Sequence, residues 1–263
     1  MALSLDLAGK KALITGVTSG IGAAIATMLA RAGCDVAGCG KSSADNAGAL
    51  DFQRRVGECG RRADYRVVDL VRRDAARRWV DEAAAALGGC DVLVSNAGRN
   101  VFEGISNCTE AAWDECVNLD LAAHWRVAQT ARPWLERAAP GVVIIIGSNH
   151  AYATLPKCFP YNVAKAGLVA LVQSLALEWG PAIRAVGIAP GFVDTPANDA
   201  WFASFPDPVA EQRRTEALHP VGRIGKPEEI GALCAFLATS WAGFISGTTL
   251  LVDGGRSARM QDE

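Results

Sequence analysis

The 263-residue sequence lacks the patterns that mark metal-binding, disulfide-rich and membrane-spanning proteins. No two of its eight cysteines are spaced as C-x-x-C, and its three histidines show no zinc-ligand spacing, so a metal site is not expected. The cysteines are dispersed along the chain, which is typical of reduced thiols. The longest uninterrupted aliphatic run, 142–146, is far too short to span a bilayer.

The sequence also has no excess of positive charge and no leader pattern at its amino terminus. Its formal net charge is −2, so we expect neither nucleic acid nor a membrane surface as a partner. The first residues lack a basic segment and are interrupted by Asp6, which argues against a signal peptide. We therefore expect a cytoplasmic protein.

Short apolar runs alternate with long alanine-rich segments along the whole chain. Most of these runs are continuously apolar, as expected for strands that helices cover on both faces. The alternation implies right-handed crossovers and an α/β fold, a Rossmann-type doubly wound parallel sheet of seven strands with helices on both faces. No linker interrupts the pattern, so we predict a single domain over residues 1–263. The predicted strands are 11–15, 35–39, 64–68, 91–95, 142–147, 184–188 and 248–252.

One irregular stretch, from Pro190 to Pro220, departs from this alternation. It contains Trp201, Phe202, Phe205 and three interior prolines. A long aromatic insertion at the carboxyl edge of a parallel sheet predicts a lid over a ligand. A packed excursion on the protein surface is an equally weighted alternative.

A glycine-rich turn follows the first predicted strand. Gly16 closes that strand, and Gly20 and Gly22 open the next helix. Glycine lets backbone amides approach a phosphate, and the amino terminus of a helix supplies a positive dipole. The spacing G-x-x-x-G-x-G differs from the common G-x-G-x-x-G fingerprint. Its place after the first strand nevertheless favours a nucleotide site over an ordinary turn.

The end of the second predicted strand carries no carboxylate before Asp45. An acidic residue there would bind the adenosine ribose and repel a 2′-phosphate. Lys41, Ser42 and Ser43 stand there instead, which favours NADP as the cofactor and leaves NAD open. Lys41 is equally consistent with a solvated turn.

Polar residues also end the third and fourth predicted strands. Asp69 follows the third strand, and Asn96, Ala97 and Gly98 follow the fourth. The carboxyl ends of parallel strands form the ligand-binding edge of such sheets, so we predict that these residues line the site. The structural alternatives are a helix N-cap for Asp69 and a plain turn for 96–98.

Tyr161 and Lys165 are four positions apart and therefore share one face of a helix. A free phenol titrates near pH 10 and is a poor base at neutral pH. An ammonium about 4 Å away, at an effective dielectric of about 20, stabilises the phenolate by on the order of 4 kcal/mol before desolvation. Such a pair suits general acid–base catalysis. Ser148 ends the run 142–146, so its hydroxyl is expected at the same edge of the sheet.

These motifs, in this order, resemble the single-domain short-chain dehydrogenase/reductase family. The resemblance implies an NAD(P)-dependent oxidoreductase that reversibly transfers a hydride between a secondary alcohol, or its carbonyl, and nicotinamide. It also implies a homo-oligomer, with four subunits usual. The motifs that carry it are Thr15–Gly22, Asp69, Asn96–Gly98, Asn118, Ser148, Tyr161-x-x-x-Lys165, Pro190–Gly191 and Asp253–Gly255.

The resemblance also implies a role for each candidate residue. Tyr161 is the expected general acid and base, and Lys165 is expected to bind the nicotinamide ribose and promote ionisation of the tyrosine. Ser148 is expected to donate to the substrate oxygen, and Asn118 to maintain a water relay. The residues expected to line the dinucleotide are Gly16, Ser19, Gly20, Ile21, Lys41, Asp69, Leu70, Asn96, Ala97, Gly98, Tyr161, Lys165, Pro190, Gly191, Val193 and Thr195.

Two positions depart from the family pattern. Gly147 stands where a second serine often precedes the catalytic serine, which looks harmless. Ser19 stands where NADP-dependent members often carry a basic residue, so the choice between the two coenzymes stays open.

The substrate is less constrained than the chemistry. Asn149 and His150 follow Ser148, where members of the family commonly contact substrate, and Trp201 lies in the predicted lid. His150 either binds a polar substrate or bonds to the backbone. The segments 195–201 and 219–227 resemble members that oxidise free sugars such as fucose. We predict a sugar or polyol, with reduction of a 3-oxoacyl thioester, as in 3-oxoacyl-[acyl-carrier-protein] reductases, as the alternative.

Overall fold

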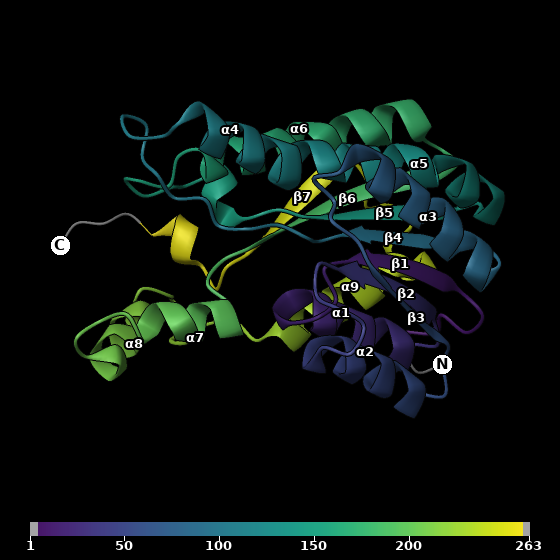
Figure 1. The fold of residues 1–263 in the computed structure, drawn as a ribbon, viewed down its shortest axis with the longest axis horizontal. Helices are drawn as coiled ribbons and strands as arrows, with labels where there is room; N and C mark the ends of the chain where they lie inside the picture. The colour runs from purple at the N-terminus through teal and green to yellow at the C-terminus, as the bar shows by residue number, and fades with distance from the viewer. Residues whose placement is uncertain (1–4, 260–263) are drawn as a thin grey trace.

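The computed structural model describes residues 5–259, in which one parallel sheet lies between two layers of helices (Figure 1). The sheet has seven strands in the order β3-β2-β1-β4-β5-β6-β7. The predicted Rossmann-type fold is therefore confirmed, with strand ends shifted by one or two residues. The strands are β1 (Lys11–Thr15), β2 (Asp35–Gly40), β3 (Ala63–Val67), β4 (Val92–Ser95), β5 (Gly141–Ile146), β6 (Ile183–Pro190) and β7 (Thr248–Val252).

The helices cover both faces of the sheet. Figure 1 shows α3, α4, α5 and α6 on one face and α1, α2 and α9 on the other. The helices are α1 (Gly20–Arg31), α2 (Ala47–Glu58), α3 (Arg73–Leu87), α4 (Glu110–Val117), α5 (Ala123–Ala138), α6 (Tyr161–Trp179), α7 (Pro196–Phe202), α8 (Pro208–Ala217) and α9 (Pro227–Ala238).

The position of β5 inside the sheet explains why its sequence is continuously apolar. Val143 and Ile145 belong to the core under α3, α5 and α6, whereas Val142, Ile144 and Ile146 belong to the core under α1 and α9. Successive side chains of a strand point to opposite faces, so a strand between two helical layers needs apolar residues at every position. Each such side chain stabilises the fold by about 1.5–3 kcal/mol.

The parallel sheet brings the carboxyl ends of its strands to one edge. Between β1 and β4 the strand order reverses, because β2 and β3 extend to one side and β5 to β7 to the other. Open α/β sheets bind ligands outside this point. The glycine turn after β1, the turn after β4 and the Ser148 turn after β5 all lie along this edge.

The predicted irregular stretch after Pro190 has more regular structure than the sequence suggested. Pro190 ends β6, and the segment beyond it contains α7 and α8, which Figure 1 shows set apart from both helical layers. Pro196 and Pro208 each occupy the first turn of a helix, where proline lacks no needed N–H. Its prolines therefore start helices instead of preventing them.

Other expectations concern the thiols and the ends of the chain. The eight cysteines are all free, as their dispersed spacing predicted. Among residues 5–259, no helix combines the length and the apolar character needed to cross a membrane. The leader prediction rests partly on residues 1–4, which lie outside the described residues.

Candidate active site

The turn between β1 and α1 leaves no room for side chains at its glycine positions. Gly16 and Gly20 have φ angles of +74° and +54°, which L side chains rarely adopt. A Cβ atom on Gly22 would lie 1.9 Å from the Gly16 carbonyl oxygen. Within the described chain, the N-cap Ser19 makes no side-chain hydrogen bond to α1, and the first turn carries no acidic residue. The amino terminus of α1 therefore fits the pyrophosphate of a dinucleotide.

Asn96 ties this glycine turn to the end of β4. Its Nδ2 atom donates to the carbonyl oxygens of Thr15 and Gly16, at 3.0 and 3.2 Å. The backbone N–H groups of Asn96 and Ala97 donate to Thr15 Oγ1 at 2.8 and 2.9 Å. These hydrogen bonds hold the glycine turn against the turn after β4, at the point between β1 and β4 where the strand order reverses.

The residues at the end of β2 and β3 form a more exposed group. Lys41 Nζ lies 3.6 Å from Asp69 Oδ2, and 73% of the Lys41 side chain is exposed. Asp69 is not the N-cap of α3, a position held by Arg72, but it accepts the Val71 N–H at 3.2 Å. The N-cap alternative for Asp69 is therefore wrong. The ammonium group of Lys41 lies at the carboxyl edge of the sheet and is accessible to solvent.

The segment after β6 closes over the glycine turn. The Cγ2 atom of Thr195 lies 3.3 Å from where a Cβ atom of Gly20 would stand. Val193 is buried, and Gly191 packs against Asp253 after β7. These contacts place the predicted residues after Pro190 beside those after β1, although more than 170 positions separate them in the sequence. Of the other predicted residues, Leu70 is buried and Ile21 is half-buried.

Ser148, Tyr161 and Lys165 meet at the carboxyl end of β5. Tyr161 begins α6, and Lys165 Nζ lies 5.3 Å from the centre of its ring. Ser148 Oγ accepts the backbone N–H of His150 at 3.2 Å, and the His150 ring lies edge-on to Tyr161, with 5.9 Å between centres. The exposed fractions of Ser148, Tyr161 and Lys165 are only 6%, 8% and 3%, so these three polar side chains lie in a region from which water is largely excluded.

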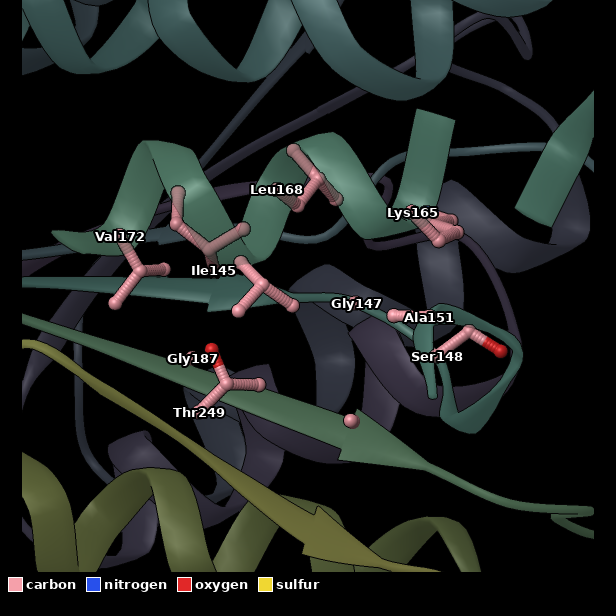
Figure 2. Close-up of a pocket in the computed structure, with 11 residues that line it drawn as sticks. Ile145, Gly147, Ser148, Ala151, Lys165, Leu168, Val172, Gly187 and Thr249 are labelled. Atoms are coloured by element: carbon pink, nitrogen blue, oxygen red, sulfur yellow. The ribbon is translucent and has the colours of Figure 1, made fainter. Parts of the chain in front are cut away.

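Figure 2 shows the pocket that Ser148 and Lys165 line together. Ile145 of β5 and Leu168 and Val172 of α6 form its apolar inner wall. Lys165 of α6 and Ser148 of the turn after β5 both lie toward the other end of the pocket (Figure 2). Because water is largely excluded, the charge of the ammonium acts more strongly on its neighbours than it would in solvent.

A buried carboxylate beside Lys165 was missed by the sequence analysis. Asp120 is fully buried, and its Oδ1 atom lies 3.3 Å from Lys165 Nζ and accepts the Arg99 N–H at 3.0 Å. Burial raises the pKa of Asp120, while the charge of Lys165 opposes that shift. The signal in the sequence was a charge in an apolar segment, two positions after Asn118.

Asn118 opens the π-helical turn η1 (Asn118–Ala122) that joins α4 to α5. Its Nδ2 donates to the Val71 carbonyl at 3.1 Å, and its Oδ1 accepts from Arg126. Its backbone carbonyl accepts the N–H of Ala123. Both ends of the side chain therefore brace neighbouring elements, and π-turns of this kind are common at functional sites.

A second unpredicted group is a buried histidine on α5. His124 Nδ1 lies 2.8 Å from Ser95 Oγ at the end of β4. Burial, with a smaller contribution from the charge of Lys165, lowers the pKa of His124 to about 3. The imidazole is therefore neutral and adds no positive charge beside the Asp120–Lys165 pair.

Aromatic rings form the walls around Tyr161. Phe102 lies 5.3 Å from Tyr161 and 5.9 Å from His150, measured between ring centres. His150 Nδ1 lies 3.0 Å from Thr154 Oγ1, so its ring bonds a side chain and the predicted alternative of a backbone bond is wrong. Asn149 donates instead to Ser257 Oγ at 3.3 Å, away from the ring cluster.

Trp201 belongs to a separate aromatic cluster in the segment after β6. Its ring centre lies 4.7 Å from that of Phe205 and 5.4 Å from that of Phe192. Among the described residues, no ring contact joins Trp201 to Tyr161. Of the predicted substrate residues, only His150 is thus brought directly beside Tyr161.

Comparison with known proteins places this geometry among oxidoreductases. A family model described as Enoyl-(Acyl carrier protein) reductase matches residues 16–257. The chain is 35% identical to 3beta-hydroxysteroid dehydrogenase 1 of Eggerthella lenta, over 95% of this chain and 94% of that protein. It is 34% identical to the cis-4-hydroxycyclohexanecarboxylate dehydrogenase of Sinomonas cyclohexanicum, over 95% and 98%. The structure of Thermoplasma acidophilum aldohexose dehydrogenase matches with a TM-score of 0.87 and 27% identity, over 98% and 97% of the two chains.

Proposed function

The chain belongs to the short-chain dehydrogenase/reductase family of oxidoreductases, and we propose that it oxidises a secondary hydroxyl group carried on a ring, or reduces the corresponding ring ketone, with NADP. The observation that carries this proposal is the meeting of Ser148, Tyr161 and Lys165 beside the rings of Phe102 and His150. The proposal includes sugars, which were the expectation from sequence, together with alicyclic alcohols.

The residues of the coenzyme side fit a nicotinamide dinucleotide. The uncapped amino terminus of α1 would take the pyrophosphate, and Asp69, Asn96 and Thr195 would line the remainder. When bound, the dinucleotide supplies the hydride acceptor or donor. The protein contributes binding, orientation and proton transfer.

Ser148 is prepared to donate to the substrate oxygen. A hydroxyl group has one donor and two acceptor sites. The backbone N–H of His150 already occupies one acceptor site of Ser148, so the hydroxyl hydrogen is left for the substrate. We assign Tyr161 the transfer of the proton itself, taken from the alcohol in oxidation and returned to the carbonyl oxygen in reduction.

Lys165 has three N–H donors, and one of them faces Asp120. The others are left for the nicotinamide ribose, while the positive charge favours the phenolate of Tyr161. Asn118 enters this scheme through the π-helical turn that it opens, because that turn carries Asp120. The expected water relay would pass the proton onward from Lys165 along this turn.

NADP is favoured over NAD by the side chains at the end of β2. Gly40 supplies no carboxylate to repel a 2′-phosphate, and Lys41 is exposed beside it. A Cβ on Gly40 would lie 3.1 Å from both Thr18 and the Tyr65 hydroxyl oxygen, so an acidic side chain there would have to displace a neighbour. Titrating both coenzymes by nicotinamide fluorescence tests this preference, and tighter binding of NAD would reverse it.

A ring-borne alcohol is favoured by the walls of the site and by the matched proteins. The T-shaped contact of Phe102 with Tyr161 leaves a flat apolar surface beside the phenol, and 46% of Phe102 is exposed. The names of the two matched relatives and of the matched structure all denote alcohols on six-membered rings or on steroids. The aromatic cluster of α7 would act as the lid over such a ring.

The test is a substrate panel followed at the nicotinamide absorbance band with both coenzymes. It contains an aldohexose, cyclohexanol, a 3β-hydroxysteroid and a 3-oxoacyl thioester. Turnover of a ring alcohol supports the proposal. Exclusive turnover of the thioester would replace it with the second candidate, 3-oxoacyl thioester reduction, which the description of the matching family model favours.

We also propose that the protein assembles into homo-oligomers of four subunits through α6. The apolar segment of this helix exposes Leu177 to 84% and Val163 to 41%. Light scattering of the purified protein tests the subunit number, and a monomer would contradict it. The expected cytoplasmic location is tested by fractionation of the source cells.

A further inference from the structure

The last turn of the described chain lies between the catalytic turn and the helices of the lid. This short 3₁₀ turn, η4 (Arg256–Ala258), follows β7 and appears in Figure 1 as a yellow coil between the ends of the upper loops and α7–α8. On one side Ser257 Oγ accepts from Asn149 at 3.3 Å. On the other side Arg259 donates to the Ala217 carbonyl of α8 at 3.1 Å. The turn thus connects both walls of the site.

The backbone before Arg256 is fixed. The carboxylate of Asp253 accepts the N–H of Gly255 at 3.0 Å and that of Ser257 at 2.8 Å. Gly255 has a φ angle of +83° and a Cβ there would lie 3.0 Å from Pro220, so the chain can take this path only with glycine. The backbone of Arg256 is therefore held in place by the hydrogen bonds of this turn.

Arg256 differs from the other arginines near the site in its lack of a partner. Within residues 5–259 its side chain makes no ion pair and no hydrogen bond, although it is half-buried. Arg99, Arg214 and Arg223 each lie 2.6–2.8 Å from a carboxylate oxygen. Burial lowers the pKa of Arg256, with a further contribution from the charge of Arg214. A desolvated guanidinium is favourable only when an anion meets it.

His150 connects this guanidinium to the reacting groups. Asn149, the residue before His150, donates to Ser257, the residue after Arg256, so His150 and Arg256 extend from two segments that are hydrogen-bonded to each other. Burial lowers the pKa of His150, and the charge of Arg256 adds to that shift. The same imidazole ring lies 5.9 Å from Tyr161. A ligand lying along His150 would therefore have one end at the phenol of Tyr161 and the other at Arg256.

We propose that Arg256 is an anion-binding subsite, which holds the carboxylate or phosphate of a ring alcohol whose hydroxyl lies at Ser148 and Tyr161. The inference rests on the proposed function and narrows its substrate to hydroxy acids or sugar phosphates. A guanidinium suits both groups because its planar fork binds two oxygens at once. The coenzyme pyrophosphate is not a candidate, because its proposed place is the amino terminus of α1.

The kinetic test compares charged and neutral forms of the same substrate. One pair is cis-4-hydroxycyclohexanecarboxylate and its methyl ester, and the other is an aldohexose and its 6-phosphate. Removing a charge-assisted hydrogen bond costs about 10- to 100-fold in affinity. Arg256→Ala should therefore raise KM for the preferred anion by about that factor, with kcat and the neutral form little changed. Arg256→Lys should restore part of it, and Arg213→Ala, which removes an exposed arginine of α8, should change nothing.

A titration of the histidines tests the subsite without catalysis. In Arg256→Ala the pKa of His150 should rise toward its ordinary value, because one of the two causes that lower it is gone. His124, whose shift has other causes, should not move. Nuclear magnetic resonance of the three histidine rings gives both values from one sample.

The outcomes separate the two proposals. Equal use of acid and ester by the unmodified enzyme, or no change in this preference in Arg256→Ala, overturns the subsite and leaves ring-alcohol oxidation standing. Activity on the phosphate alone or on the carboxylate alone identifies the anion and supports the subsite. Turnover of no ring alcohol, charged or neutral, would instead remove the proposed function on which the inference rests.

Discussion

Gly22 and Trp201 mark the proposed coenzyme side and the proposed substrate side of the site, which are built in different ways. Around Gly22 the contacts are made by the backbone carbonyl groups of Thr15 and Gly16 and by the Asn96 amide that bonds them, and even one added carbon would overlap a carbonyl oxygen. Around Trp201 the contacts are between large rings of a segment outside the sheet, and 39% of the tryptophan is exposed. The coenzyme side is thus fixed by the chain path, and the substrate side by side chains.

This difference indicates where the protein tolerates amino-acid substitutions. A backbone site leaves few alternatives, because carbonyl and amide groups cannot be moved without breaking the sheet. A wall of rings can be replaced by other rings, since its contacts are apolar and not directional. We expect substitutions on the coenzyme side to affect folding and binding together, and those on the substrate side to change selectivity alone.

The largest expected effect lies where the two sides meet. Tyr161→Phe removes the only group assigned to move the proton, so activity should fall by about 10²- to 10⁴-fold. Coenzyme binding should persist, because the turn at Gly22 is untouched. Initial rates and nicotinamide fluorescence measure the two quantities. A near-normal rate would refute the role of the phenol.

On the coenzyme side, Gly22→Ala should destabilise the fold and weaken coenzyme binding. The new Cβ would lie 1.9 Å from the Gly16 carbonyl oxygen and 2.6 Å from Asn96 Nδ2, so backbone must shift at a cost of about 1–3 kcal/mol. Gly57→Ala is the matched control, because nothing lies within 4 Å of that position in α2. The control should stabilise the protein by up to about 1 kcal/mol. Urea unfolding with and without coenzyme measures the stability of both variants. Equal free energies of unfolding for Gly22→Ala and Gly57→Ala would contradict the assignment of close backbone packing to the coenzyme side.

Asp120→Asn should shift the pH dependence of alcohol oxidation. The groups that face Asp120 are Lys165, Arg99 and the thiol of Cys116. With the carboxylate gone, the charge of Lys165 beside the reacting phenol is unopposed, so the acid limb of kcat/KM should move to lower pH. Glu115→Gln removes an exposed carboxylate that pairs with Arg99 and is the control. A limb that stays in place, or moves to higher pH, contradicts this electrostatic assignment.

The smallest expected effect is on the substrate side. Trp201→Ala removes one aromatic partner, worth about 0.5–1.5 kcal/mol, so KM for a ring alcohol should rise by roughly 3- to 10-fold. Coenzyme affinity should not change. Trp241→Ala, at an exposed tryptophan of the turn after α9, is the control. If Trp201→Ala weakens coenzyme binding as much as substrate binding, the division into two sides is wrong.

The same division separates what the sequence predicted from what it did not. Continuous apolar runs require helices on both faces of a sheet, so the sheet could be predicted from the sequence. Glycines at fixed places require close backbone contacts, so the glycine turn could be predicted as well. Asp120 could not, because its meaning depends on Lys165 in another helix. Nor could α7 and α8, whose prolines suggested an irregular loop until their place in the first helical turn was known.

The hydrogen bonds on either side of η4 connect this turn both to α8 and to the turn that contains Asn149. Two hydrogen bonds lead from α8 to Asn149, the residue next to Ser148: Arg259 donates to the Ala217 carbonyl, and Asn149 donates to Ser257. We therefore expect any movement of the segment after β6 to be coupled to the position of the Ser148 turn, over a path of only a few residues after the last strand.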